Sequence, residues 1–290
     1  MYEFSLKFIR CVNCNSKLEL EILKQQREIE EGFLLCQNCK AKYPIIQKIP
    51  ILWNSFSAYL STRTKLGGEL FLKSQSKKMK SFIKKSLSQI HKNTEDRSLI
   101  EKRWARIYQN SINSKFYSII RKNLDDIPKQ NLVLEHGCSI GHISQHLSKK
   151  HEIVFGIDRS FSAISIAKKI KNKNLDFFVA DSLDHPFGHQ KFGLIVGLNL
   201  LEIIEPLNLL KVLSKQLKKG TILLSDPYDY ERATYSVKNQ LDSIQIRKTL
   251  QKIGFNIFPK TKKSSFIPWN LVINPRAQLH YNVDLITARR

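Results

Sequence analysis

The pattern of hydrophobic and polar residues changes character near residue 131. Between residues 56 and 130 glycine and proline are scarce, and hydrophobic residues recur every three or four positions between lysines, as in KSQSKKMKSFIKKS. This spacing predicts amphipathic helices, with a break near Asn110–Asn113. From Asn131 onward, short apolar runs alternate with helical stretches, which predicts parallel strands covered by helices on both faces.

The predicted strands of the second region number seven and imply an α/β fold with a Rossmann-like, doubly wound, mostly parallel seven-stranded sheet. Helices are predicted at His142–Lys150, Ser160–Lys171, Glu205–Lys218 and Val237–Ile253. The strands are predicted at Leu132–His136, Glu152–Asp158, Asp176–Asp181, Phe192–Leu198, Thr221–Ser225, Phe255–Phe258 and His280–Thr287. Between the last two lies Lys260–Arg276, whose Phe266, Pro268 and Trp269 either fold over a site or, the interpretation we favour for Trp269, pack the sheet edge.

The first 55 residues contain two Cys-x-x-Cys pairs, CVNC at Cys11 and Cys14 and CQNC at Cys36 and Cys39. Four thiolates on two short knuckles form a closed tetrahedral zinc site without an open position for water. The 21 residues between Cys14 and Cys36 leave room for a hairpin such as Leu18–Phe33. We therefore predict a structural zinc ion and three regions: a zinc ribbon at 1–55, a basic helical linker at 56–130 and a nucleotide-binding domain at 131–290.

A glycine-rich turn follows the first predicted strand, in the stretch LEHGCSIG. Gly137 and Gly141 allow a tight turn and the close approach of a ligand to the backbone. A dinucleotide site requires three glycines spaced G-x-G-x-x-G, and Ser139 stands at the middle position here. S-adenosylmethionine has no phosphate and tolerates a looser turn, but its nucleoside and methionine portions need carboxylates.

Carboxylates end the first three predicted strands. Asp158 is placed to accept both ribose hydroxyls, and Asp181 to accept the exocyclic amine of adenine beside Ser182 and Leu183. Glu135 can support the turn and the methionine amino group. Acidic residues are common at strand ends, but three in succession after a glycine turn favour S-adenosylmethionine as the cofactor.

Two stretches resemble known families. After the second cysteine pair, KAKYPIIQKIPILW resembles the zinc ribbons of small activator subunits of tRNA and translation-factor methyltransferases, and related ribbons fused to methyltransferases that include some acting on ribosomal RNA. From Asn131 to Asp229, the segments LEHGCSIG, GIDRS, VADSLDHPF and FGLIVGLNLLEIIEPLNLLKVLSKQLKKGTILLSDP resemble class I S-adenosylmethionine-dependent methyltransferases, with departures at His136, Ser139 and Ile203. The ribbon resemblance rests on Tyr43, Pro44, Ile45, Ile49, Pro50 and Leu52. The predicted cofactor-binding residues are Glu135, Gly137, Cys138, Ser139, Gly141, Asp158, Arg159, Asp181, Ser182, Leu183 and Asn199.

Methyl transfer from a sulfonium depends mainly on positioning of the acceptor, so the catalytic residues stay unknown from the sequence. GLNLLEI replaces the Asn-Pro-Pro-Tyr of adenine- and glutamine-amine methylating enzymes, and the chain has no Pro-Cys nucleophile of 5-methylcytosine enzymes. Asn199, Glu202, Asp226 and Tyr228 follow the fourth and fifth predicted strands, and this position alone makes them candidates for catalytic residues.

Charge suggests a partner without naming one. The net charge is +23, and residues 61–130 contain 17 basic and 6 acidic side chains, while residues 260–290 contain 6 and 1. Such segments favour RNA, although the same lysines could simply form a solvated face or lie on a membrane surface. We see no signal peptide or membrane-spanning run and expect a cytoplasmic protein of undetermined oligomeric state.

Three functions stay open at this point. The first is methylation of RNA, and the second is methylation of an amine-bearing small molecule or peptide. A faint likeness of DPYDY and the late Pro-Trp segment to methyltransferases of histidine-like compounds supports the second. The third is a methyltransferase-like module that binds without catalysis.

Overall fold

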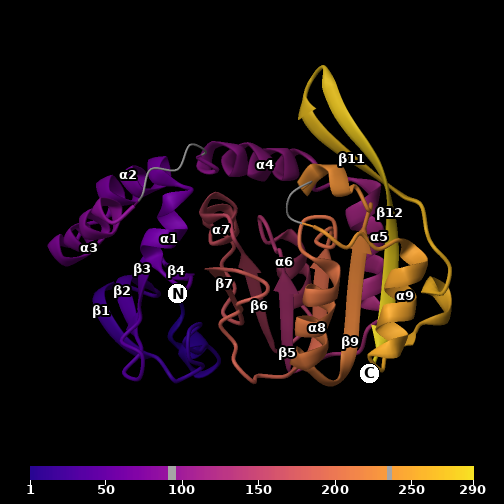
Figure 1. Cartoon of the computed structure of the whole chain (residues 1–290), viewed down its shortest axis with the longest axis horizontal. Coiled ribbons are helices and arrows are strands. Elements are labelled where there is room, and N and C mark those ends of the chain that lie inside the picture. The colour runs from indigo at the N-terminus through magenta and orange to yellow at the C-terminus, as the bar shows by residue number, and fades with distance from the viewer. Residues whose placement is uncertain (91–95, 234–236) are drawn as a thin grey trace.

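The computed structural model describes residues 1–90, 96–233 and 237–290; residues 91–95, inside the predicted basic segment, and 234–236 lie outside the described residues. Within the described residues a single sheet runs through the molecule in the order β1-β2-β3-β4-β7-β6-β5-β8-β9-β12-β10, with β11 paired to β12 (Figure 1). The strands are β1 (Glu19–Gln25), β2 (Ile29–Leu35), β3 (Lys42–Ile46), β4 (Ile49–Leu52), β5 (Leu132–His136), β6 (Ile153–Asp158), β7 (Leu175–Ala180), β8 (Phe192–Leu198), β9 (Leu217–Asp226), β10 (Asn256–Ile257), β11 (Ile267–Asn274) and β12 (Ala277–Arg289).

Five parallel strands, β7-β6-β5-β8-β9, form the centre of the sheet, and β12 adds antiparallel to β9. All five residues of β5 are buried, because both faces of this strand are covered. This arrangement confirms the Rossmann-like, mostly parallel part of the predicted fold. The carboxyl ends of the parallel strands lie at one edge, where ligands of such sheets bind.

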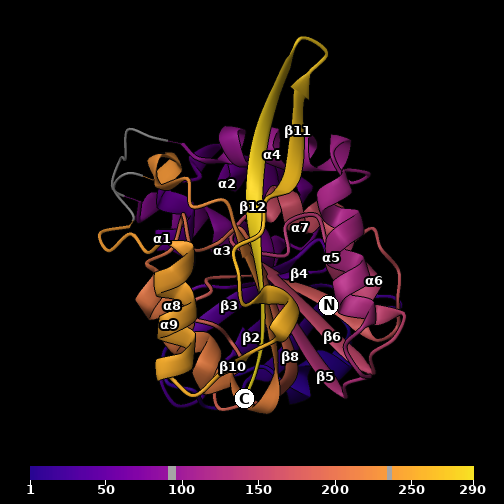
Figure 2. The same ribbon diagram turned by 90° about the vertical axis from the view of Figure 1, so that its right-hand side faces the viewer.

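Helices cover both faces of the central sheet, with α8 and α9 on one side and α5 and α6 on the other (Figure 2). Most buried hydrophobic residues divide accordingly into two large clusters, one including Phe177 and Trp269 and the other Phe155 and Phe187. The helices are α1 (Phe56–Ser61), α2 (Thr64–Lys73), α3 (Lys77–Ser88), α4 (Ser98–Asn110), α5 (Lys115–Asp125), α6 (His142–Ser148), α7 (Phe161–Ala167), α8 (Pro206–Gln216) and α9 (Ser243–Lys252), with short 3-10 turns at Glu3–Lys7, Tyr230–Ala233 and Pro259–Thr261.

The prediction of seven strands was wrong, because the sheet has twelve strands within the described part of the chain. Four additional strands come from the N-terminal segment: β1 to β4 form an antiparallel sheet, and β4 then pairs in parallel with β7. In that pairing Ile51 lies opposite Val179 and Leu52 opposite Ala180. The N-terminal sheet therefore continues the central sheet.

The fifth additional strand, β11, forms a hairpin with β12 that projects beyond the rest of the sheet (Figure 1). Its residues alternate between buried and exposed from Ile267 to Leu271, the pattern of a strand with one covered face. Trp269 is buried here against the rings of Tyr108, Phe116 and Tyr281. Trp269 thus takes the packing role that we favoured, while Phe266 is exposed.

Tertiary contacts move several predicted helix boundaries. The helix predicted to end at Lys218 ends at Gln216, because Leu217 already pairs with Phe192 in the sheet. The helix predicted from Val237 begins at Ser243, where Asp242 and Gln245 form a capping box. The predicted break near Asn110–Asn113 is present, between α4 and α5.

The linker helices lie over the carboxyl edge of the sheet. Figure 1 shows α4 crossing above α7 and α6 toward the β11–β12 hairpin, and α4 contacts both α7 and β11. Ala105 of α4 packs with Ile140 of the glycine turn and with Ala163 of α7. Among the described residues, no helix is both long and apolar enough to cross a membrane.

Candidate functional site

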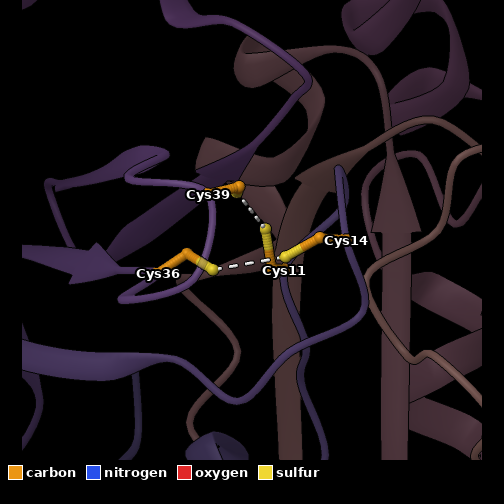
Figure 3. Close-up of side chains that lie close together, drawn as sticks. All are labelled: Cys11, Cys14, Cys36 and Cys39. Atoms are coloured by element: carbon orange, nitrogen blue, oxygen red, sulfur yellow. Dashed lines mark hydrogen bonds between the residues drawn. The ribbon is translucent and has the colours of Figure 1, made fainter.

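The four cysteines of the N-terminal segment lie together (Figure 3). All four Sγ atoms fall within 4.8 Å of one another, and the pairs Cys11–Cys39 and Cys14–Cys36 are each 3.4 Å apart. A disulfide has an S–S distance of about 2.0 Å, whereas sulfurs around a tetrahedral zinc lie about 3.8 Å apart. The cluster is therefore compatible with a structural zinc ion and has no disulfide among these residues.

The two cysteine knuckles have the same backbone shape. The residue after each second cysteine has a positive φ, 60° at Asn15 and 59° at Lys40. In each knuckle the N–H of the first cysteine donates to the carbonyl five residues later, from Cys11 to Ser16 and from Cys36 to Ala41, both at 2.9 Å. This matched geometry directs two thiols from each knuckle toward one point, which a metal site requires.

The glycine turn after β5 is tightly packed. Gly137 and Gly141 have φ values of 63° and 76°, and a Cβ on either would come within 2.6 Å of Leu200 or Phe177. Cys138 is buried in the same turn, and burial, followed by the charges of Glu135 and Asp158, raises the pKa of its thiol well above the usual value. This thiol is therefore a packing group and a poor nucleophile.

Asp158, at the end of β6, closes the turn from the next strand. Its Oδ2 accepts the backbone N–H of Ser139 at 2.9 Å, and its Oδ1 accepts that of Ser160 at 2.8 Å. Burial raises the pKa of this carboxyl in spite of both bonds. A carboxylate has about four acceptor positions, so two ribose hydroxyls fit the capacity that remains.

The residues predicted to surround adenine lie beyond β7. Asp181 accepts the N–H of Leu183 through Oδ1 at 2.8 Å, and its Oδ2 lies 4.0 Å from the guanidinium of Arg159. Ser182 is buried and Leu183 is half-buried. The structure thus brings Asp158, Arg159 and Asp181 to one end of the edge.

Glu135 lies beneath the turn, where Ser144 Oγ donates a hydrogen bond to it. Burial raises the pKa of Glu135 to about 8, and the bonds from Ser144 only partly offset this effect. A positively charged amino group nearby would favour the ionised form. Glu135 is therefore suited to respond to a cation at the turn.

The catalytic candidates follow β8 and β9. Asp226 accepts the N–H groups of Leu201 at 2.7 Å and Tyr228 at 2.8 Å, and Asn199 accepts a hydrogen bond from Ser225 Oγ at 2.9 Å. Tyr228 donates its hydroxyl to Asp284 at 2.9 Å. Asp284 in turn accepts hydrogen bonds from the two Nη groups of Arg247 at 2.6 and 3.0 Å. The fourth candidate, Glu202, is fully buried. These contacts lock the loops after β8 and β9 together.

Three non-glycine residues with positive φ stand at the ends of neighbouring strands. They are Ser139 after β5, Asn199 after β8 and Tyr228 after β9, with φ values of 47°, 56° and 58°. Backbone strain of this kind concentrates at functional sites. All three belong to the residues that the sequence predicted for cofactor or acceptor contacts.

The linker helices add polar contacts that the sequence did not predict. Tyr59 of α1 donates its hydroxyl to the carbonyl of Arg159 at 3.0 Å and accepts the N–H of Phe161 at 3.2 Å. Arg63 stacks on Tyr59 and binds Glu101 of α4 through Nη2 at 2.6 Å. Tyr59, Arg63 and Glu101 belong to no recognisable sequence motif. They are distant from Asp158 in the sequence and come near it only in the folded protein.

Comparison with known proteins supports this arrangement. Residues 133–220 match the family described as "Methyltransferase domain". The matched stretch covers less than a third of the chain. It runs from β5 into β9 and includes the glycine turn, Asp158 and Asp181. No curated protein matches the chain.

Two solved structures share the fold. One is magnesium protoporphyrin IX methyltransferase (ChlM) from Synechocystis PCC 6803 with bound SAH, at 19% identity and a TM-score of 0.50, covering 67% of this chain and 94% of that one. The other is a chain of the complex between the Haloferax volcanii Trm112 methyltransferase activator and a methyltransferase, at 16% identity and a TM-score of 0.52, covering 65% and 96%. Together the comparisons support an S-adenosylmethionine-dependent methyltransferase in general and leave the methyl acceptor open.

Proposed function

We propose that this protein is a methyltransferase that transfers the methyl group of S-adenosylmethionine to RNA. The observation that carries the cofactor assignment is Asp158, whose carboxylate joins the glycine turn after β5 to the turn after β6. That position suits the two ribose hydroxyls. Asp181, with Ser182 and Leu183, would hold the adenine, and Glu135 would face the methionine amino group.

The bound sulfonium would supply an activated methyl group, and the chain would mainly position the acceptor. The turn of Gly137, Cys138, Ser139 and Gly141 would border the methionine portion. Asp226 and Tyr228 are engaged with backbone N–H groups and with Asp284, so we assign them to positioning of the loops. Asn199, half-buried with positive φ, is the candidate for contact with the acceptor, whereas Glu202 is fully buried.

RNA is proposed as the acceptor because of α4, which lies over the carboxyl edge and carries Lys102, Arg103 and Arg106 exposed on its outer side. Helix α3 adds exposed Lys84 and Lys85, while its Met79 and Ile83 are buried. Basic side chains beside a site bind the phosphate backbone through release of counterions. The acceptor would thus be held by its backbone while one base or ribose enters the site.

The cofactor assignment is tested by calorimetry with S-adenosylhomocysteine. We expect the Asp158→Ala variant to lose measurable binding, and Asp126→Ala, which removes an exposed carboxylate on the surface, to bind as the wild type does. Equal affinity of the Asp158→Ala variant and the wild type would overturn the assignment.

The acceptor is tested by transfer of a radiolabelled methyl group into fractionated RNA, protein and small molecules. We expect label in RNA, and we expect Arg103→Glu with Arg106→Glu to reduce both labelling and RNA affinity. Lys248→Glu with Lys252→Glu, a matched change on the exposed side of α9, should have little effect. An RNA affinity that does not fall with added salt would contradict the proposal.

Methylation of a small-molecule or peptide amine is the second candidate function. The structure of magnesium protoporphyrin IX methyltransferase shares this fold and acts on a small molecule, so the fold is compatible with such acceptors. Label in the small-molecule or peptide fraction would favour this alternative. Tight binding of the cofactor without transfer to any fraction would indicate a binding module without catalysis.

A further inference from the structure

The strand that joins the N-terminal sheet to the central sheet places Trp53 beside Asp181. Strand β4 runs parallel to β7, with Leu52 opposite Ala180, so the next residues on the two strands, Trp53 and Asp181, leave the sheet side by side. Trp53, Asn54, Asp181 and Asp184 line a common shallow depression at the surface. An aromatic ring from the N-terminal segment is therefore adjacent to the carboxylate proposed to bind adenine.

A series of packed side chains, called the stack here, continues from Trp53 toward Asp158. The ring of Trp53 packs on Tyr59 at a tilt of 55° with 5.3 Å between centroids, and the Arg63 guanidinium lies 4.4 Å from the centre of the Tyr59 ring. Tyr59 bonds the backbone on both sides of Ser160, directly after Asp158. The stack thus extends from Asp181, which is proposed to bind adenine, to the turn that follows Asp158, which is proposed to bind the ribose.

The far side of the stack is fixed by an ion pair. Nε of Arg63 lies 3.1 Å from both carboxylate oxygens of Glu101, and Nη2 lies 2.6 Å from Oε1. The side chain of Arg63 is 3% exposed. A planar guanidinium held in this way leaves the rings of Tyr59 and Trp53 with little freedom, so they form a preorganised surface.

We propose that Trp53 is a cofactor-contacting residue, with its indole packed against the adenine ring whose amine Asp181 accepts, and that Tyr59 is a positioning residue for the turn after Asp158. This inference rests on the proposed cofactor. An aromatic face beside a purine provides stacking without hydrogen bonds. The N-terminal segment would then form part of the nucleoside pocket.

The test uses the full chain and S-adenosylhomocysteine as the probe. By calorimetry we expect Trp53→Ala to weaken binding about 5- to 100-fold, and Trp53→Phe, which keeps a ring, to weaken it less. The affinity of Trp53→Ala for adenosine should fall by the same factor, because Trp53 contacts only the base of either probe. Tyr59→Phe keeps the stack and removes the hydroxyl, so we expect a smaller loss of affinity for both probes.

Intrinsic fluorescence supplies a second measurement. Wild-type emission should be quenched by S-adenosylhomocysteine; Trp53→Phe should abolish the quenching, and Trp104→Phe should retain it. A folded Trp53→Ala variant with wild-type affinity, or quenching that persists in Trp53→Phe, would overturn the inference. If Trp53→Ala does not fold, the quenching of fluorescence measured in Trp53→Phe tests the inference on its own. Absence of binding by the wild type would instead overturn the proposed function itself.

Discussion

Lys168 connects three parts of the chain through a buried ion cluster. Its ammonium, on the residue that follows α7, lies 2.6 Å from Glu28 in the β1–β2 hairpin and 2.7 Å from Asp176 in β7. The three side chains are at most 7% exposed. Burial alone would lower the pKa of Lys168, but the two carboxylates outweigh that effect and raise it. We predict that Lys168→Met strongly destabilises the fold.

The size of the effect follows from what the substitution leaves behind. Methionine fills a similar volume but leaves Glu28 and Asp176 buried without their shared cation. Loss of one partner of a buried ion pair costs about 3–5 kcal/mol. Asp176 keeps hydrogen bonds from Ser5 Oγ at 2.7 Å and from the N–H of Tyr2 at 2.9 Å, so we expect the lower half of this range.

The measurement is the free energy of unfolding from urea titration at neutral pH. Lys260→Met is the matched control, since Lys260 pairs with Asp126 at 3.3 Å with both side chains largely exposed, and its loss should cost less than about 1 kcal/mol. If Lys168→Met unfolds within about 1 kcal/mol of the wild type, the cluster does not hold the hairpin to the central sheet.

Three further predictions concern the metal, the glycine turn and Glu135. The purified protein should contain one zinc per chain by elemental analysis, and Cys36→Ser should abolish zinc binding and lower the unfolding temperature; a metal-free wild type with an unchanged melting curve would contradict the cluster's structural role. Gly141→Ala should destabilise the fold by about 1–3 kcal/mol in urea titrations, because φ is 76° and a Cβ would lie 2.6 Å from Phe177, whereas Gly68→Ala, with open space in α2, should be neutral or slightly stabilising. The pKa of Glu135 is raised from 4.5 to about 8, so its protonated form supports folding below about pH 4.5 and this contribution is lost as the pH rises through 8. The stability of Glu135→Gln should therefore gain on that of the wild type between about pH 5 and 8.5, and parallel pH profiles would refute the assigned pKa.

Local signals predicted the parts of the molecule that local sequence determines. The turn of Gly137 and Gly141 follows β5 as expected, and the cysteine pairs converge, because tight turns and knuckles depend on a few adjacent residues. Contacts between segments that are distant in the sequence leave no such local pattern of residues. The pairing of β4 with β7 and the bonds of Tyr59 to the turn after β6 arise only when the sheet assembles.

Strand β11 was missed for a different reason. Its alternating pattern is visible in Ile267, Trp269 and Leu271, but we treated the whole of Lys260–Arg276 as a connection between the last two predicted strands. Proline is tolerated in this hairpin because β11 pairs only with β12 and leaves its other edge free of strands among the described residues. The stability of such a strand depends on the helices α4 and α5 that cover it.

The pairing of β4 with β7 also determines what else can dock on this molecule. An open parallel edge is a template on which another polypeptide can add a strand, through backbone hydrogen bonds that need no particular side chains. Here that place is already taken by the protein's own N-terminal segment. A separate subunit that stabilised a methyltransferase by extending its sheet beside β7 would have to displace β4. The strand that covers this edge is thus part of the same polypeptide. The covering strand β4 and the central sheet are therefore always made in equal amounts.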